Sequence, residues 1–320
     1  QVAPYVSLVT ETNMAHKANI SYFGNGFNEA QLVYNFSLPP LVLHTFHTED
    51  ARVLSQWAKT LSLPSNEVTF LNFLASHDGI GITPARGILT ESQIDKMAQR
   101  TQALGGNVST KRNPDGSESI YELNINYLDA LGNPNKPDED LQLVSHRFLA
   151  SQAIMLALRG VPGIYLHSLL GSRGWRHAVA HPSHYRTINR EKLERNTLDA
   201  ELSDPNSLRH KVFYDYLKLI KLRTASDRRA FHPNGGQQIL ISNNAVFTLL
   251  RSAPDNEDHI FCIHNISAQN QVVSIHHELF TRLAEAPLTD GFTGQGYHLK
   301  NGTLTLTLDP YQVIWLYSAP

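Results

Sequence analysis

Short apolar runs alternate with helical patterns along the first part of the chain. Four of these runs are rich in residues that favour strands; they cover residues 5–9, 32–36, 68–74 and 164–166. Apolar runs with almost no alternation are typical of strands buried on both faces of a parallel sheet that helices cover. Apolar positions at helical spacing predict helices over residues 50–60, 148–158 and 208–222. The order of strand and helix therefore predicts an α/β fold with a parallel sheet.

The number of predicted strands is small for the length of this region. A complete (β/α)8 barrel needs about 250 residues, or about 30 for each strand-helix unit. Only four strands are predicted before residue 221, and the first lies within a few residues of the start. The chain forms either a smaller α/β sheet or half of a barrel. We favour the C-terminal half of a (β/α)8 TIM barrel, strands five to eight, within residues 1–228.

The pattern changes after about residue 231. Short apolar runs are separated by turn residues such as Asn-Asn and Asn-Gly, and Leu304, Leu306 and Leu308 alternate with threonines. This period of two, with frequent turns, predicts antiparallel strands. We therefore expect a small all-β C-terminal domain over residues 229–320.

A long excursion, residues 83–140, separates the third and fourth predicted strands. It begins with a predicted helix over residues 91–104, continues with a polar, loop-like segment over residues 105–119, and ends with the pattern YELNINYLDAL. Connections this long in a compact domain are usually functional lids or small subdomains. We therefore expect an inserted lid or subdomain.

Composition and charge exclude several classes of protein. The 320 residues carry a formal net charge of −2, with 41% hydrophobic residues and no segment in which Lys and Arg cluster, so nucleic acid is not an expected partner. No apolar run reaches the roughly 18 residues of a membrane span, and no signal peptide is recognisable. The single cysteine, Cys262, excludes a disulfide framework or a structural zinc site. We expect a cytoplasmic protein that uses no metal and has no membrane partner.

Polar, titratable residues stand where two predicted strands end. Glu11 follows the first strand, and Ser76-His77-Asp78 follows the third. In a (β/α) barrel the C-terminal ends of the strands form the catalytic rim. Alternatively, Asp78 caps the next turn and His77 pairs locally. These residues alone do not decide between the two interpretations.

Six motifs together form a specific pattern: VTETN, YNFSLPPLVLH, SHDGIG, YELNINYLDAL, RGVPGIYLHSLLG and YRTINREKL. In this order they resemble the sucrose-phosphorylase branch of the α-amylase superfamily, glycoside hydrolase family 13. The resemblance covers most of the chain, from Tyr5 to about Lys221, and the all-β tail is similar to the small C-terminal domain of such enzymes. Within the branch, the YELN pattern is more similar to glucosylglycerate phosphorylases than to sucrose phosphorylases.

The resemblance implies a role for each matching residue. Glu11 matches the general acid/base at the end of barrel strand five. His77 and Asp78 match the pair at the end of strand seven, where the aspartate stabilises the transition state and holds glucose hydroxyls. Arg186 matches an arginine after strand eight that binds the far side of the glucosyl ring.

Two departures from the family pattern change the expectation. Tyr121 and Glu122 match a mobile loop that contributes to acceptor and phosphate binding, but sucrose phosphorylases usually carry glutamine at the second position, which argues against sucrose as substrate. The family's nucleophile, an aspartate in a G-F-R-x-D motif after strand four, has no counterpart. The chain therefore resembles a C-terminal fragment of a longer enzyme. We expect it to be inactive alone and to self-associate, for example as a homodimer, through its exposed sheet edge.

The implied reaction is that of a retaining α-glucoside phosphorylase. Two carboxyl groups about 5–5.5 Å apart flank the glycosidic bond; one protonates the leaving oxygen and the other forms a covalent glucosyl-enzyme. Inorganic phosphate, the co-substrate, then takes the glucosyl group and gives glucose 1-phosphate. The expected partners are a small glucoside, such as glucosylglycerate, and phosphate, with neither metal nor organic cofactor.

Other functions remain open from the sequence. The chain could belong to a sucrose or sucrose 6-phosphate phosphorylase, to an α-amylase-family hydrolase or transglucosidase, or to a non-catalytic carbohydrate-binding protein. Arg173, Arg176 and His177 are candidates for contacts with phosphate or a carboxylate, although such polar runs are usually solvated loops. Trp57 and Trp315 fit apolar patterns and are expected in the core.

Overall fold

Four parallel strands form the central sheet of the computed structural model, which describes residues 5–136, 138–179, 182–227, 229–282 and 287–318. The strands pair in the order in which they occur in the chain. They are β1 (Val9–Thr10), β2 (Leu32–Tyr34), β3 (Thr69–Asn72) and β7 (Val161–Pro162). A parallel sheet in chain order, with a crossover between each pair of strands, is the arrangement expected for half of a (β/α)8 barrel.

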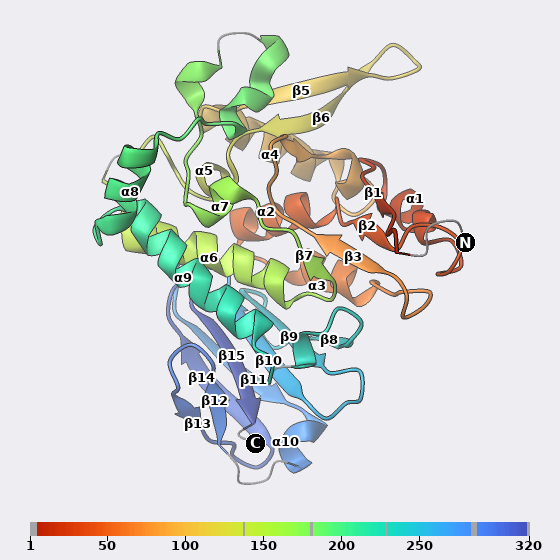
Figure 1. Cartoon of the computed structure of the whole chain (residues 1–320), viewed down its shortest axis with the longest axis vertical. Helices are drawn as coiled ribbons and strands as arrows, with labels where there is room; N and C mark the ends of the chain where they lie inside the picture. Colours follow the sequence, from red (N-terminus) through yellow and green to blue (C-terminus); the bar gives the residue numbers. More distant parts are fainter. Residues whose placement is uncertain (1–4, 137, 180–181, 228, 283–286, 319–320) are drawn as a thin grey trace.

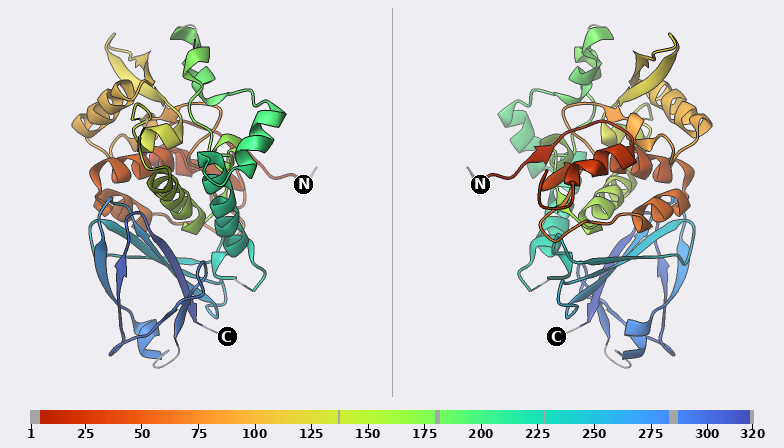
Figure 2. Two further views of the ribbon diagram at one scale, coloured as in Figure 1. Left: turned by 90° about the vertical axis from the view of Figure 1, so that its left-hand side faces the viewer. Right: turned by 90° about the vertical axis from the view of Figure 1, so that its right-hand side faces the viewer.

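Helices connect these strands and pack beside the sheet (Figures 1 and 2). They are α1 (His16–Ile20), α2 (Leu38–Thr48), α3 (Arg52–Lys59), α5 (Tyr127–Leu131), α6 (Leu141–Ala157), α7 (Leu166–Leu169), α8 (Arg195–Ser203) and α9 (Leu208–Thr224). Prolines in the first turn of α2 suit a helix start, because the first turn has no intrahelical use for their missing N–H groups. Asp140 accepts a hydrogen bond from the backbone of the first turn of α6, which explains why this helix begins before the predicted residue 148.

The two faces of the sheet differ in burial. Val33 pairs with Phe70 in register, and both side chains are buried in a core that also contains residues of α2, α3 and α6. On the opposite face Leu32, Tyr34 and Leu71 are only partly buried. The prediction that these strands are buried on both faces is therefore wrong for alternate positions of β2 and β3.

The predicted positions of two strands need correction. The first strand occupies Val9–Thr10 rather than residues 5–9. The fourth lies at Val161–Pro162, inside the Gly-Val-Pro-Gly segment interpreted as a helix terminator, whereas Leu166 begins α7. Gly160 explains this shift, since its φ is +135° and a Cβ there would lie 2.6 Å from the Phe70 carbonyl oxygen. Only glycine permits such close approach to β3.

The excursion forms a small α/β unit at the end of the molecule opposite the β domain (Figures 1 and 2). It contains α4 (Glu91–Ala103), β5 (Asn107–Arg112) and β6 (Glu118–Asn124). Together with β4 (Ile80–Gly81), which lies just before the excursion, these strands form a three-stranded antiparallel sheet in the order β4-β6-β5. A capping box between Thr90 and Gln93 begins α4. The polar segment predicted as a loop contains β5, whose side chains are partly or fully exposed. Its pairing with β6 explains why a strand forms without an apolar pattern. Residue 137 of the predicted insert lies outside the described residues.

Two sheets form the C-terminal region. Its strands are β8 (Gly236–Leu240), β9 (Val246–Ser252), β10 (His259–Asn265), β11 (Gln271–His276), β12 (Leu288–Asp290), β13 (Gly296–Tyr297), β14 (Thr303–Leu308) and β15 (Val313–Ser318), with the short helix α10 (Glu278–Arg282). A six-stranded sheet, β13-β12-β15-β10-β9-β8, packs on the β11–β14 ribbon through a second hydrophobic cluster. As predicted, Leu304, Leu306 and Leu308 are buried. The boundary predicted at residue 228 falls outside the described residues and stays a prediction.

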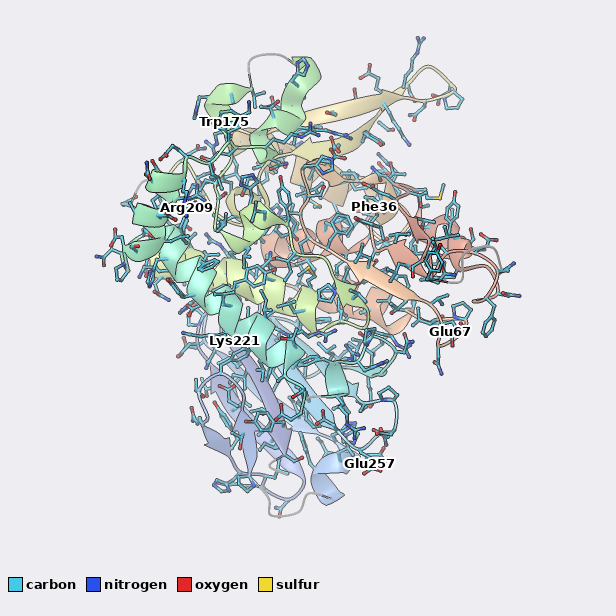
Figure 3. All side chains as sticks on the ribbon, viewed as in Figure 1. Phe36, Glu67, Trp175, Arg209, Lys221 and Glu257 are labelled. Atoms are coloured by element: carbon cyan, nitrogen blue, oxygen red, sulfur yellow. The ribbon has the colours of Figure 1, made fainter. Side chains whose placement is uncertain are left out.

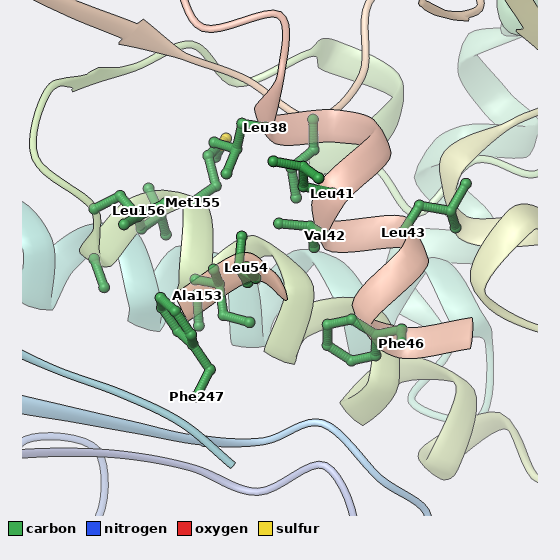
Figure 4. Packing of buried hydrophobic residues seen from close by; sticks show 14 of the residues in the cluster. Leu38, Leu41, Val42, Leu43, Phe46, Leu54, Ala153, Met155, Leu156 and Phe247 are labelled. Carbon is green, nitrogen blue, oxygen red and sulfur yellow. The ribbon is translucent and has the colours of Figure 1, made fainter. Parts of the chain in front are cut away.

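The barrel helices and the six-stranded sheet share one core. Figure 4 shows Leu41 and Phe46 of α2 near Leu54 of α3 and Ala153 of α6, with Phe247 of β9 below them. Trp57 and Trp315, at 4% and 0% exposure, belong to this core as predicted. Within the described residues, no helix has both the length and the apolar character needed to span a bilayer.

Candidate active site

The carboxyl ends of the parallel strands bring distant polar residues to one edge of the sheet. Glu11 directly follows β1, and the His77–Asp78 loop follows β3. The long connection after β7 carries Arg186 in the 3₁₀ helix η4 (Pro182–Asn189), whereas Tyr121 and Glu122 come from β6 of the insert. Parallel strands present their C-terminal ends at the same edge, which explains why these segments meet.

A cavity of about 310 Å³ opens at this edge. Its lining includes all six residues singled out from the sequence: Glu11, His77, Asp78, Tyr121, Glu122 and Arg186. The structure therefore places the two predicted catalytic carboxyl groups in the wall of one cavity. Their chemical roles stay predictions.

Two arginines and a histidine approach one oxygen of Asp78. Its Oδ1 lies 3.0 Å from Arg186 Nη1, 3.1 Å from Arg190 Nη2 and 3.5 Å from His77 Nε2. Its backbone N–H also donates to Ser76 Oγ at 3.1 Å. The local contacts of the alternative interpretation, a turn at Asp78 and a contact with His77, are therefore present. They occur together with ion pairs to distant arginines, which hold the carboxylate at the cavity.

Glu122 and Arg186 form a two-point ion pair. Arg186 Nε and Nη2 donate to Glu122 Oε2 and Oε1, both at 3.0 Å, and Glu122 is only 4% exposed. The hydrogen bonds that Arg186 donates to Glu122 are the largest cause of its raised pKa, and the charge of Asp78 raises that pKa further. Arg186 was expected to bind a glucosyl ring, but its planar fork is occupied by a carboxylate from the insert.

The first strand contributes a residue that sequence reasoning missed. Asn13 lies two positions after Glu11 and also lines the cavity. Among the described residues, no group hydrogen-bonds to its buried Oδ1. Gly81 makes room for this side chain, because a Cβ at position 81 would lie 2.8 Å from Asn13 Nδ2. The sequence signal that could have indicated Asn13 is its position two residues after the glutamate at the end of the strand.

Three aromatic rings form an apolar wall of the cavity that was not predicted. Tyr34 and Phe36 stack at 5.6 Å, and Phe73 contacts them edge-on at 5.3 and 5.1 Å between centroids. Phe36 is labelled in Figure 3. Burial raises the pKa of Tyr34, and the charge of Glu11 raises it further. The lining of the cavity thus combines acidic and basic side chains with an aromatic surface, a combination suited to a sugar ring.

The basic residues of the loop after β7 that were candidates for contacts with phosphate or a carboxylate lie away from the cavity. Arg173 Nη1 pairs with the buried carboxylate of Asp129 at 2.9 Å, and Arg176 Nη1 donates to Asn135 Oδ1 at 2.8 Å. Neither arginine lines the cavity, and His177 does not line it either. The described residues contain no group of three or more His, Cys, Asp or Glu side chains arranged to hold a metal ion.

Known proteins resemble the whole chain. It is 45% identical over 99% of its length to a glucosylglycerate phosphorylase of Spirochaeta thermophila, and 30% identical over 54% of its length to a sucrose phosphorylase of Agrobacterium vitis. It covers 53% of the first protein and 34% of the second. The sucrose 6F-phosphate phosphorylase of Thermoanaerobacter thermosaccharolyticum has a similar structure, with a TM-score of 0.66, 21% identity and coverage of 82% of this chain and 48% of that one. Comparison with models of known families finds no match.

The chain belongs to the sucrose-phosphorylase-like branch of the α-amylase superfamily. It spans about half the length of the curated relatives that match it over almost its full length. The predicted fold class, a partial (β/α)8 barrel followed by a β domain, is confirmed. Position 122 is a glutamate. The structure supplies a physical context for a glutamate here, since its two oxygens each accept from a different nitrogen of Arg186, whereas glutamine has a single acceptor oxygen.

Proposed function

We propose that this chain is the acid/base half of a retaining α-glucoside phosphorylase. The proposed reaction moves a glucosyl group from a small glucoside to inorganic phosphate and gives glucose 1-phosphate. The observation that carries the proposal is the cavity shared by Glu11, at the end of β1, and Asp78, after β3. The similarity to glucosylglycerate phosphorylases over almost the entire chain supports the same class of reaction.

Each residue has a proposed part in two half-reactions. Glu11 gives its proton to the oxygen of the leaving group as the glycosidic C–O bond breaks, and a carboxylate outside this chain forms the glucosyl ester. Glu11 then accepts a proton from phosphate while a phosphate oxygen displaces that ester. Asp78, held beside two arginines, opposes the positive charge that develops on the sugar ring.

Glucosylglycerate is the proposed donor. Two observations favour it over sucrose: the name of the relatives at 40–45% identity and the Glu122–Arg186 pair, which a glutamine would not form in the same way. Tyr121 and Glu122 are proposed to contact the acceptor side of the cavity. A cytoplasmic location and self-association stay predictions. Val9, on the outer strand β1, is 47% exposed and gives self-association a structural basis.

The test uses a completed protein, in which this chain is fused behind the part of the Spirochaeta thermophila relative that it does not match. We expect glucose 1-phosphate from glucosylglycerate only when inorganic phosphate is added, and no turnover by the isolated chain. Glucose release that does not depend on phosphate would instead favour a hydrolase or transglucosidase. A folded completed protein that cleaves no α-glucoside would refute the proposal.

Replacing Glu11 separates its role from a merely structural one. Glu11→Gln removes proton transfer but leaves the cavity shape almost unchanged. We expect loss of glucosylglycerate cleavage and much smaller loss with α-glucosyl fluoride, because fluoride departs without help from a general acid. Equal losses with both donors would show that Glu11 is not the acid.

A further inference from the structure

Asn189, the last residue of η4, and Arg190, which follows it, clamp the loop that carries Asp78. Asn189 Nδ2 donates to the Asp78 carbonyl oxygen at 2.8 Å. Arg190 Nε donates to the His77 carbonyl oxygen at 3.0 Å, and its Nη2 donates to Asp78 Oδ1 at 3.1 Å. Two adjacent residues therefore fix two backbone carbonyls and one carboxylate oxygen in a loop more than 100 positions earlier in the chain.

The contacts distinguish the two oxygens of Asp78. Arg186 Nη1, Arg190 Nη2 and His77 Nε2 all approach Oδ1. Each of these contacts is recorded at Oδ1, and within the part of the chain that the structure describes no hydrogen bond engages Oδ2. The side chain is 25% exposed and lines the cavity. Oδ2 is thus the oxygen left available to a bound molecule.

The clamp is itself held in place. Asn189 is 6% exposed, and its carbonyl oxygen accepts a hydrogen bond from the Tyr165 hydroxyl at 2.6 Å. Burial raises the pKa of Tyr165, so its hydroxyl keeps the donor proton at neutral pH. A chain of contacts therefore runs from Tyr165 through Asn189 to the backbone of Asp78.

Charge balance permits two arginines at one oxygen. Arg186 and Arg190 converge on Asp78, and Glu122 supplies the second negative charge through its contact with Arg186. Two cations and two anions leave the cluster without net charge. The two carboxylates offset the repulsion between the two guanidinium groups that converge on one oxygen.

We propose that Arg190 is a positioning residue which, with Asn189, holds Asp78 so that a single carboxylate oxygen faces the sugar. The proposal rests on the role given to Asp78 above. Arg190 uses one edge of its planar guanidinium to reach a carbonyl and a carboxylate at once. A lysine keeps the charge but presents a single ammonium group, so it does not reproduce this fork. Geometry, rather than charge alone, is the contribution of Arg190.

The test measures fluoride release from α-glucosyl fluoride by the completed protein, because this reaction needs Asp78 but no particular acceptor. We expect Arg190→Lys to lower kcat by about ten- to a hundredfold, the range for losing hydrogen bonds to a charged group. Arg190→Gln should lose at least as much. In the Asp78→Asn background, Arg190→Lys should have almost no further effect, because Arg190 acts through Asp78.

Arg52→Lys is the matched control, since Arg52 is an exposed arginine that forks onto Asp50 away from the cavity. It should leave kcat within about twofold, as exposed pairs contribute little. Unchanged kcat in Arg190→Lys, or an equal loss in the presence and absence of Asp78→Asn, would overturn the proposal. Near-ultraviolet circular dichroism that matches the parent excludes misfolding as the cause. If fluoride release behaves as expected but phosphate gives no glucose 1-phosphate, the phosphorylase proposal fails and the positioning role stands.

Discussion

Replacing Glu122 with glutamine tests the ion pair that joins the insert to the barrel rim. The carboxylate is 4% exposed and accepts from Arg186 Nε and Nη2, both at 3.0 Å. Glutamine has nearly the same shape but only one acceptor oxygen. Its amide N–H group would face a guanidinium N–H, so one of the two hydrogen bonds becomes a contact between donors.

The expected loss in the free energy of unfolding lies between the values typical of buried and of exposed ion pairs. Removing one partner of a fully buried ion pair costs about 3–5 kcal/mol, whereas exposed pairs contribute about 0–1 kcal/mol. The Arg186 side chain is 42% exposed and keeps Asp78 as a second partner at 3.0 Å. Solvent screening and this remaining contact reduce the loss. We therefore expect Glu122→Gln to destabilise the folded chain by about 1–2 kcal/mol.

Urea unfolding of the 320-residue chain at pH 7 measures this loss of stability. Amide hydrogen exchange in β6 and in the loops of the rim reports whether the loss is local. Asp50→Asn is the matched comparison, because Asp50 also accepts the fork of an arginine, Arg52, but in an exposed setting. It should cost less than about 1 kcal/mol and lose most of that in high salt. Equal costs for the two variants would refute the argument that burial strengthens the Glu122–Arg186 pair.

Two further predictions concern pH and packing. Burial lowers the pKa of His264 from 6.5 to about 4, and burial with the charge of Arg100 lowers that of His47 to about 3. Below pH 6.5 the unfolded chain therefore binds more protons than the folded chain. The free energy of unfolding should fall by about 2 kcal/mol per histidine between pH 7 and pH 5. His264→Gln should reduce this dependence of the unfolding free energy on pH, measured by urea unfolding at each pH, and an unchanged dependence would contradict the assignment. Gly79→Ala should lower the free energy of unfolding by about 1–3 kcal/mol, because a Cβ there would lie 2.7 Å from the Leu123 carbonyl oxygen. Gly163→Ala, where no atom lies nearer than 3.6 Å to the added Cβ, should cost far less in the same urea measurements.

The parallel sheet could be predicted because its physical signal is local. An apolar run bounded by turn residues indicates a strand whatever its partner, and β2 and β3 lie within the predicted ranges. The fourth strand could not be placed in the same way. Val161–Pro162 reads as part of a helix terminator, and only the close packing of Gly160 on β3 makes it a strand. Likewise β5 has no apolar pattern and depends on its neighbour β6.

The candidate site was predictable for a different reason. Residues at the carboxyl ends of parallel strands converge through topology alone, so Glu11 and Asp78 could be assigned to one rim before any distance was known. Which charges pair could not be assigned, because that depends on how the insert folds over the rim. Glu122 reaches Arg186 only through the β4–β6 pairing, in which Gly81 lies opposite Glu122. Once that pairing forms, Arg186 becomes a bridge between two carboxylates, and Arg190 becomes the side chain that completes the charge balance around Asp78. The rim therefore carries the groups that are proposed to react, whereas the insert, Asn189 and Arg190 are proposed to set their orientation. Substitutions at Glu122 and Arg190 should accordingly weaken the contribution of Asp78 while leaving Glu11 and the Asp78 carboxylate in place.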